Sequence, residues 1–242
     1  MSGFLLSLLA HTLSDFVIQK ESTVSEKNKG KFKQFFLHAF AVAFVTFLFL
    51  LPFKGLNPLY FALFVLLIHL LIDYLKHILD KLFDKAKSNF KALTFLLDQL
   101  LHIFSLLVLS QTIPLLPRPF FASLLTDFPI IEAYILIPIV YIFVVFGGAH
   151  FVRLILDSVP SKKGEKAENA NKGKLIGILE RTLMLTFWVT GNPSGIAIVL
   201  TAKSIARFKE FDDKEFAEYY LIGTLSSTLV ALAGGIILLK II

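Results

Sequence analysis

The chain contains no cysteine. Disulfide bonds and thiolate ligands are therefore excluded, and any bound metal ion must be held by imidazole, carboxylate or carbonyl groups. Charged residues are also few, since Asp, Glu, Lys and Arg make up 17% of the 242 residues. The net charge of +6 is modest and does not point to a nucleic-acid partner. We therefore expect neither a disulfide framework nor nucleic-acid binding.

Hydrophobic residues make up 56% of the sequence, Phe occurs 26 times, and the mean hydropathy is +0.75. A soluble domain of this length does not carry repeated apolar runs of about 17 or more residues. Apolar segments occur approximately at residues 3–19, 35–51, 57–75, 92–113, 130–155, 174–190, 193–206 and 216–240. The first has no basic start and no small-residue cleavage site, so we interpret it as a membrane helix and not a signal peptide. These features predict a single all-α domain, a polytopic membrane helix bundle of about eight transmembrane helices.

Lysines alternate between the connections of the predicted helices. The connections at residues 20–33 and 76–91 are rich in lysine, whereas the intervening ones carry only Lys54 and Arg118 as basic residues. The positive-inside rule places the lysine-rich connections in the cytoplasm and both termini outside. The predicted location is the bacterial cytoplasmic (inner) membrane, with the lipid bilayer as a partner. The short segment 193–206 either crosses or re-enters, and re-entry would move the C-terminus inside.

Polar features divide the predicted bundle further. Residues 1–113 form a half that carries histidines and aspartates, and residues 114–242 form a second helical half with a flexible cytoplasmic loop at 157–173. Residues 75–90 combine an apolar helical stripe with lysines on the opposite side, which predicts a separate amphipathic helix on the cytoplasmic surface. The alternative, an extension of the third helix into water, would leave the stripe wet.

Histidine and aspartate recur at a spacing of four residues, which places both side chains on one face of a helix. The pairs are His11 with Asp15, His69 with Asp73, and Asp98 with His102. At about 1.5 Å of rise per residue, these pairs and His38 fall in one slab roughly 5 to 15 Å beneath the cytoplasmic boundary. We therefore predict that these residues come together as metal ligands.

Carboxylates at membrane depth cost at least ~2.5 to 3.5 kcal/mol each, so they require compensation. A shared divalent cation would compensate all of them, and the mixed nitrogen and oxygen ligands favour Zn, with Mn or Fe as alternatives. The first two His-Asp pairs would complete one tetrahedral site, leaving the other residues for a second metal or for supporting contacts. A buried hydrogen-bond network between helices and a proton relay are the alternatives.

The second half places further charged residues at the same inner level, namely Glu180, Arg181, Lys203 and Arg207. The three basic side chains are candidates for an anion site that binds a phosphate or carboxylate. Interfacial anchoring and an ion pair of Glu180 with a basic neighbour are the alternative interpretation.

Several motifs resemble a family of bacterial multi-pass membrane proteins carried only as a domain of unknown function. Besides His38, they are HTLSDFVIQ (11–19), HLLIDYLK (69–76), DQLLH (98–102), GKLIGILER (173–181), TAKSIARF (201–208) and EYYLIGTLSS (218–227). The resemblance implies a membrane location but no activity. H-x-x-x-D is also similar to the transport-site motif of cation diffusion facilitator zinc transporters, although the chain lacks their soluble C-terminal domain and six-helix plan.

We therefore expect a membrane-embedded, metal-dependent hydrolase acting on a lipid or another amphiphilic, phosphorylated substrate. The metal would activate water, Asp98 would be the base, and Lys76, Arg181 and Lys203 would hold the anion. A metal-ion or proton-coupled transporter and a membrane scaffold with a structural His/Asp cluster are the alternatives. The number of ligands favours the enzyme, because transport needs a site weak enough to release its ion.

Overall fold

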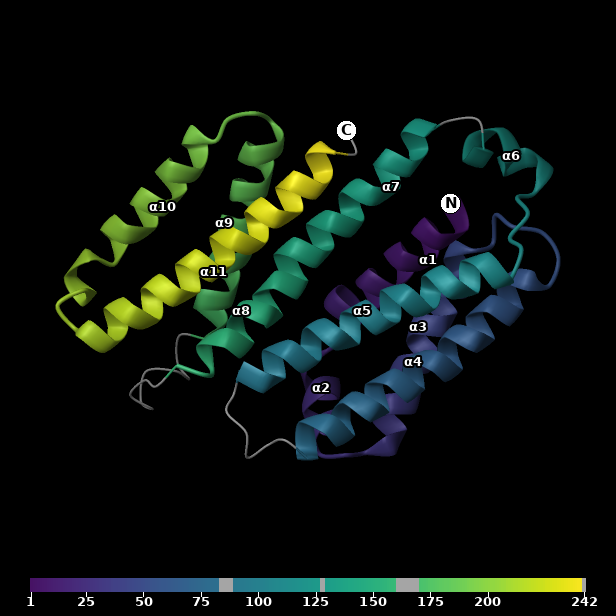
Figure 1. The fold of residues 1–242 in the computed structure, drawn as a ribbon, viewed down its shortest axis with the longest axis horizontal. Helices are drawn as coiled ribbons and strands as arrows, with labels where there is room; N and C mark the ends of the chain where they lie inside the picture. The colour runs from purple at the N-terminus through teal and green to yellow at the C-terminus, as the bar shows by residue number, and fades with distance from the viewer. Residues whose placement is uncertain (83–88, 127–128, 160–169, 241–242) are drawn as a thin grey trace. The chain divides into compact units, whose positions relative to one another are not determined.

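The computed structural model describes residues 1–82, 89–126, 129–159 and 170–240, and their regular secondary structure is helical (Figure 1). The first elements are α1 (Ser2–Leu13), η1 (Ser14–Ile18), α2 (Glu21–Asn28), α3 (Phe32–Phe49), α4 (Asn57–Leu82), α5 (Asn89–Thr112) and α6 (Pro119–Thr126). The following elements are α7 (Pro129–Ile142), η2 (Phe143–Gly147), α8 (Gly148–Leu156), α9 (Ala170–Val189), α10 (Ser194–Ala206), η3 (Phe208–Glu210) and α11 (Lys214–Leu239). Every apolar segment of the sequence therefore corresponds to a helix or to a run of consecutive helices.

Five of the helical segments are long and apolar enough to cross a membrane. They are Phe32–Phe49, Asn57–Leu82, Phe90–Thr112, Ile131–Leu156 and Lys214–Leu239. Ser2–Ile18 and Ser194–Ala206 are shorter apolar helices. The 13 residues of α10 span about 20 Å at 1.5 Å per residue, less than the roughly 30 Å of a hydrocarbon core. The fold indicates a membrane protein, with five candidate spans among the described residues.

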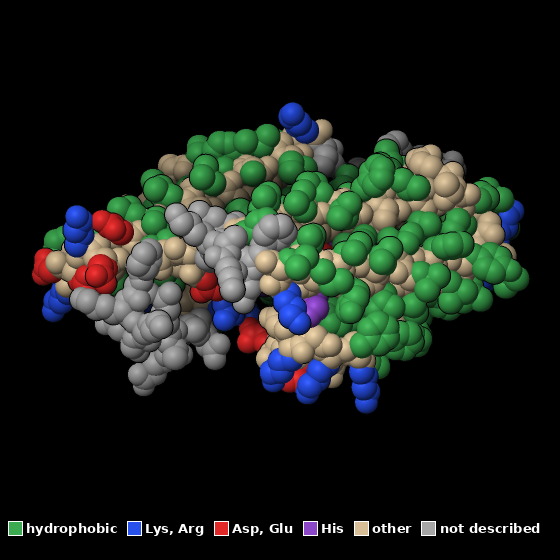
Figure 2. All heavy atoms as spheres, turned by 60° about the horizontal axis from the view of Figure 1, so that its bottom comes forward, with side chains coloured by type: hydrophobic (Ala, Val, Ile, Leu, Met, Phe, Trp, Pro, Cys, Tyr) green, Lys and Arg blue, Asp and Glu red, His purple; other side chains and the backbone are tan. Residues whose placement is uncertain are grey.

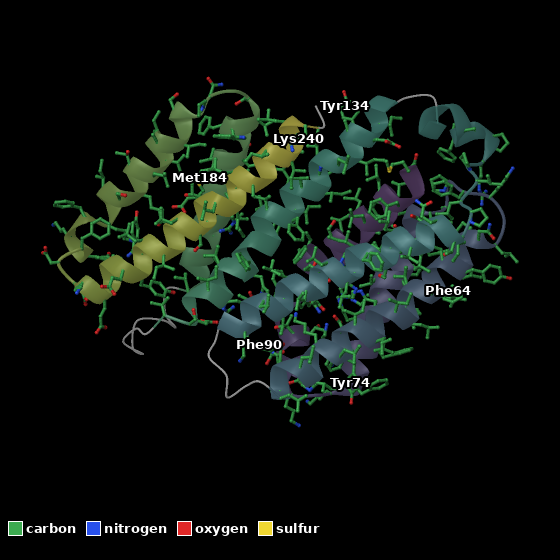
Figure 3. The ribbon with its side chains drawn as sticks, in the orientation of Figure 1. Phe64, Tyr74, Phe90, Tyr134, Met184 and Lys240 are labelled. Carbon is green, nitrogen blue, oxygen red and sulfur yellow. The ribbon has the colours of Figure 1, made fainter. Side chains whose placement is uncertain are left out.

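Large hydrophobic side chains cover the outer surfaces of these helices. On the face drawn in Figure 2, hydrophobic side chains form broad areas and charged side chains gather near helix ends. Phe64 of α4, labelled in Figure 3, is 49% exposed although it lies in the middle of a 26-residue helix. Exposed apolar side chains along whole helices are expected where lipid is the solvent.

Residues 75–82 differ from the sequence prediction. They continue α4 and do not begin a separate surface helix. No glycine or proline lies between Asp73 and Leu82, so nothing in the sequence interrupts the helical hydrogen bonds. Leu75 and Leu79 of the predicted apolar stripe are 47% and 42% exposed. Residues 83–88 and 160–169, which include parts of the predicted surface helix and polar loop, lie outside the described residues.

The chain divides into two compact units, Met1–Ala86 with Leu93–Ile139 and Lys87–Ala92 with Val140–Ile242. The division between these units falls within α7. Residues after 113 join the first unit because their backbone binds the connection between α3 and α4. Lys54 N donates to Leu116 O at 2.9 Å, and Arg118 N donates to Pro52 O at 2.8 Å.

The first unit has one continuous apolar core contributed by α1, α3, α4, α5 and α7, together with the connection after α3. Its buried members are Leu8, Val42, Leu50, Phe53, Phe61, Val65, Leu106, Leu109 and Ile139. Because these residues lie toward the end of the unit that contains the 50–57 and 113–118 connections, that end is closed by packing and by backbone hydrogen bonds.

In the second unit, α11 packs against α8 and α9, and α10 packs against α9. The close approach of α11 depends on Gly234 and Gly235, since an added Cβ there would overlap the side chains of Val144 and Trp188. Small residues at such contacts allow helices to pack closely in lipid.

Candidate metal centre

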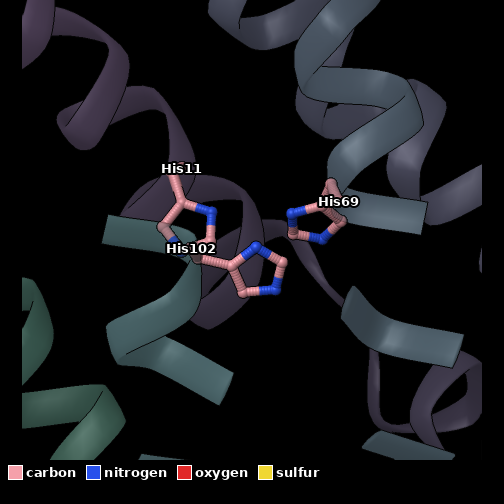
Figure 4. Close-up of side chains that lie close together, drawn as sticks. All are labelled: His11, His69 and His102. Atoms are coloured by element: carbon pink, nitrogen blue, oxygen red, sulfur yellow. The ribbon is translucent and has the colours of Figure 1, made fainter. Parts of the chain in front are cut away.

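Four helical segments of the first unit bring together seven side chains, which we call the His/Asp cluster. Its members are His11, Asp15, His38, His69, Asp73, Asp98 and His102. Asp15 is partly buried, with a side chain that is 10% exposed, and the other members are buried. Figure 4 shows His11 of α1, His69 of α4 and His102 of α5 pointing toward one another. All seven residues that the sequence analysis selected as ligands therefore lie in one place.

The imidazole nitrogens lie close to the carboxylate oxygens from neighbouring helices. His38 Nε2 lies 3.2 Å from Asp15 Oδ1, and His69 Nε2 lies 3.7 Å from the same oxygen. His69 and His102 stack with their ring centroids 4.1 Å apart. The helices therefore converge on a polar interior built from alternating imidazoles and carboxylates.

The remaining separations within the cluster are longer than hydrogen bonds. They are 3.8 Å for His11–Asp15, 3.6 Å for His69–Asp73, and 3.7 and 3.6 Å from His102 to Asp73 and Asp98. N–H···O bonds in proteins measure about 2.7 to 3.2 Å. Ligand atoms placed tetrahedrally at about 2.0 to 2.1 Å from one ion are about 3.3 Å apart. These four separations are longer than both a direct hydrogen bond and the spacing of tetrahedral ligands, so the imidazoles and carboxylates face one another without bonding directly.

Several buried polar atoms of the cluster have no hydrogen-bond partner among the described residues. They are Nε2 of His11, His69 and His102, and Oδ1 of Asp15 and Asp98. Leaving a buried polar atom unpaired costs about 1 to 3 kcal/mol, so such atoms in one cluster need an explanation. A shared cation would pair with these atoms through lone pairs that all face inward.

Local helix geometry sets the position of Asp15. Residues Ser14–Ile18 form a π-helical turn directly after α1, and Ser14 Oγ donates to Ala10 O at 2.8 Å. A π-helical turn inserts an extra residue into a helix and is frequent at functional sites. The turn rotates the following residues relative to α1, and Asp15 faces His38 of α3 as well as His11 of its own helix.

Two lysines lie at one side of the cluster. Lys27 of α2 places Nζ 2.5 Å from Asp73 Oδ2, with side chains that are 14% and 8% exposed. Lys76 Nζ lies 3.5 Å from Asp98 Oδ2, which also accepts a hydrogen bond from Gln99 Nε2 at 3.1 Å. The side chain of Lys76 is 27% exposed. The carboxylates are therefore compensated by ammonium groups on the side that reaches the surface.

The opposite side of the cluster is closed by an apolar layer. We define this layer as Leu8, Val42, Val65 and Leu106, which lie one helical turn from His11, His38, His69 and His102 respectively. A small cavity of about 10 Å³, enough for about one water molecule, lies where Val65 and Leu106 meet the three histidines of Figure 4 and Ser105. The cluster is therefore polar and partly accessible on the lysine side, and bounded by apolar side chains on the other.

The second predicted group lies in the second unit, and its members have separate partners, except that Arg181 Nη2 is buried without a hydrogen-bond partner among the described residues. Lys203 Nζ pairs with Glu180 Oε2 at 2.7 Å, and Arg207 Nη1 contacts both carboxylate oxygens of Glu210 at 2.8 Å. Arg181 is buried and donates to Val145 O, within η2, and to Ser227 Oγ, both at 3.1 Å. Of the predicted anion site, the structure brings together only Glu180 and Lys203 as a salt bridge.

Sequence reasoning missed Lys27 and Gln99 as members of the site. Lys27 was used only as a topology signal, because the polar connection around it has no apolar period that reveals a helix. A helical interpretation of residues 21–28, which contain no glycine or proline, would have been the signal. Its contact with Asp73 spans 46 residues of sequence, and no local spacing predicts that.

The apolar helices and the buried His/Asp cluster define an α-helical membrane protein with a candidate metal centre. The chain belongs to the family described as "Protein of unknown function (DUF3307)", whose model matches residues 4–130. This range contains the entire His/Asp cluster and Lys27, whereas the later motifs at 173–181, 201–208 and 218–227 lie beyond it. No curated protein and no solved structure matches the chain.

Proposed function

We propose that the protein is a membrane-embedded, metal-dependent hydrolase that acts on a lipid or another amphiphilic, phosphorylated substrate. The observation that carries this proposal is the convergence of four imidazoles and three carboxylates, of which three imidazoles and two carboxylates have a buried atom without a hydrogen-bond partner among the described residues. Such a donor set suits Zn, with Mn or Fe as alternatives, because imidazole and carboxylate ligands are combined without thiolates.

The separations within the cluster are too long for a directly hydrogen-bonded structural network. A hydrogen-bonded His/Asp network would place most nitrogen and oxygen atoms about 2.7 to 3.2 Å apart. Only the His38–Asp15 separation, at 3.2 Å, falls in that range, and Asp15 Oδ1 still lacks a hydrogen bond. Deep burial of these groups without a cation would be costly in a membrane.

The lysines support an anionic substrate. Once a metal ion compensates the aspartates, Lys27 and Lys76 are free to bind the phosphate of an incoming substrate. Both lie on the surface-accessible side of the cluster, and each ammonium group lies 5.5 Å from an aromatic ring centroid, of Phe35 and Phe95 respectively. We therefore assign the anion to these two lysines, and not to Arg181, Lys203 and Arg207 of the second unit.

The proposed reaction is hydrolysis of a phosphoester. A metal ion held by the His/Asp cluster would supply a bound water of lowered pKa and would polarise the phosphoryl oxygen. As the water oxygen bonds to phosphorus, the P–O bond to the alcohol breaks. One water proton passes to Asp98, and a proton returns to the departing alkoxide. Water and phosphoester thus become alcohol and inorganic phosphate.

The apolar layer favours hydrolysis over transport. A transporter needs a polar route that reaches the ion from both sides, in alternation. Beyond the His/Asp cluster, buried apolar side chains fill the core of the first unit toward the 50–57 and 113–118 connections. We further propose a bundle of about eight membrane helices, in which the short α10 either crosses or re-enters, with the N-terminus outside and the lysine side of the cluster in the cytoplasm of a bacterial cell. Both termini lie outside if α10 crosses.

The test uses protein purified in detergent, loaded with Zn or Mn, and assayed for metal content and for phosphate release from phosphatidic acid in mixed micelles. We expect bound metal and phosphate release in the wild type, and loss of both in His69→Ala. The matched control is His77→Ala, whose histidine contacts the Phe35 and Tyr74 rings outside the cluster and should leave both unchanged.

Three outcomes would contradict the proposal. Bound metal without phosphate release, combined with metal uptake into proteoliposomes, would establish transport instead. Proton flux that depends on His69 without bound metal would establish a relay. Absence of metal at every pH, with normal folding of His69→Ala, would leave a structural scaffold.

A further inference from the structure

We propose that the His/Asp cluster is a dinuclear centre in which Asp73 bridges two divalent ions. This inference rests on the metal-binding part of the proposed function and adds the number of ions and their ligands. The sequence analysis placed the first two His-Asp pairs in one tetrahedral site and left the other residues for a second metal or for supporting contacts, whereas the geometry regroups the ligands around a shared Asp73.

The ligand atoms form three groups, two of which share no residue. Asp15, His38 and His69 form one group, and Asp73, Asp98 and His102 form the other. Within each group, one ligand atom per residue lies within 4.8 Å of the others. Three protein ligands with remaining positions for water or substrate are typical of catalytic zinc sites. The cluster therefore contains enough ligands for two catalytic-type sites.

Asp73 links the two groups through its two carboxylate oxygens. Asp73 Oδ2 faces the first group, at 3.6 Å from His69 Nε2 and 3.9 Å from His38 Nε2. Asp73 Oδ1 faces the second group, at 3.7 Å from His102 Nε2. A carboxylate that presents one oxygen to each site can bridge ions about 3.5 to 4 Å apart, the spacing typical of two-metal hydrolytic centres.

His11 supports both sites without forming a third. It groups with His69 and His102, which already belong to the two other groups. Its Nε2 lies 3.8 Å from Asp15 Oδ2, the oxygen that is not facing His38. We assign His11 as an additional ligand or as a positioning residue for Asp15. In this arrangement Asp98 would be a ligand in place of its role as base in the proposed reaction, because water held by two ions would need no separate base.

The charge of the loaded centre suits a phosphorylated substrate. Two divalent ions outweigh the three aspartates, and Lys27 and Lys76 add further positive charge at the accessible side. A phosphate dianion would reduce this excess and could bind both ions together, as in other two-metal phosphoryl-transfer sites. A single ion would leave less excess charge for the same purpose.

The experiment measures metal per chain by elemental analysis of detergent-purified protein after Mn²⁺ loading, together with electron paramagnetic resonance. We expect two ions per wild-type chain and an exchange-coupled spectrum. His38→Gln and Asp98→Asn should each retain about one ion with an uncoupled Mn²⁺ spectrum, because each removes a ligand from only one group. Asp73→Asn should abolish the coupling, and His77→Gln is the matched control with two coupled ions.

The outcomes separate this inference from the proposed function. One ion in the wild type that both His38→Gln and Asp98→Asn remove would overturn the dinuclear centre and leave a single-metal hydrolase intact. No bound ion in the wild type would overturn both. Circular dichroism and gel filtration identify a variant that fails to fold, and His38→Ala and Asp98→Ser then provide the second test of each site.

Discussion

Replacing Lys27 with methionine removes the positive charge from a buried ion pair while keeping much of the side chain's length. In the metal-free protein, the Lys27–Asp73 pair has side chains that are only 14% and 8% exposed. Removing one partner of a buried pair costs about 3 to 5 kcal/mol, because the other charge remains buried and unpaired. Lys27→Met should therefore lower the free energy of unfolding of the metal-free protein by about that amount.

Metal binding should largely suppress this loss. In the loaded centre, Asp73 is compensated by the ions, and we expect Lys27→Met to cost about 1 kcal/mol or less, as for a weak ion pair. The difference, about 2 to 4 kcal/mol, is a coupling free energy between Lys27 and the metal. Because coupling is reciprocal, the same variant should bind metal roughly 30- to 700-fold more tightly than the wild type.

Competitive chelator titration measures the metal affinity, and denaturant titration in mixed micelles measures stability with and without metal. Lys29→Met is the matched control, because Lys29 lies on the same lysine-rich stretch, is 61% exposed, and pairs with Glu26 outside the His/Asp cluster. The reasoning is refuted if Lys27→Met binds metal no more tightly than Lys29→Met. That result would mean that Lys27 does not oppose a cation at Asp73.

Three further predictions concern other parts of the chain. Phe61→Ala should lower the free energy of unfolding by about 3 to 5 kcal/mol, because the side chain is fully buried, and metal content measured after refolding should stay unchanged. Gly235→Ala should lower the free energy of unfolding by about 1 to 3 kcal/mol, because the added Cβ overlaps Trp188. Trp188 is the only tryptophan, so its fluorescence emission should shift. Gly173→Ala is the control, because its added Cβ meets open space and should leave the emission unchanged. Hydrogen bonds from Lys29 and Lys31 lower the pKa of Glu26 to about 2. The contribution of Glu26 to stability is therefore complete above pH 4.5 and is lost as the pH falls through about 2. Titration of this carboxyl group by NMR measures the pKa, and a midpoint near 4.5 would contradict the prediction.

The His/Asp cluster could be predicted from the sequence because two sequence features agreed, the spacing of the polar residues and the length of the apolar segments. A spacing of four residues puts His69 and Asp73 on one helix face, and the length of an apolar run fixes their depth. Charged side chains at equal depth on neighbouring helices are expected to point toward one another, because exposing a charge to lipid is costly. The same reasoning predicted a helix for each apolar segment.

The contacts of Lys27, Lys203 and Arg207 could not be predicted in this way. Lys27 reaches Asp73 from a short polar helix whose orientation depends on packing against α3 and not on its own sequence period. Lys203 and Arg207 are satisfied by Glu180 and Glu210, one across helices and one within a turn. Sequence depth placed these charges at one level, but it could not tell which carboxylate each would bind.

The continuation of α4 through residues 75–82 could not be predicted from the sequence either, for a different reason. An amphipathic stripe predicts that one face of a helix is covered, but it does not specify what covers it or where the helix begins. With no residue to break the helix after Asp73, the backbone continued straight. That continuity places Lys76 one turn after Asp73, close enough for its ammonium group to approach Asp98.

The lysines also bear on how such a centre can be assembled in a membrane. Three aspartates must enter the bundle before any ion is bound, and each uncompensated carboxylate would oppose insertion by several kcal/mol. Lys27 and Lys76 supply compensation at that stage, because they contact Asp73 and Asp98 directly. On the two proposals above, the ions then take over these carboxylates, and the displaced ammonium groups remain beside the centre on its accessible side. The groups that stabilise the metal-free bundle thus become the groups that bind the substrate's phosphate, which explains why lysines and metal ligands occupy the same site.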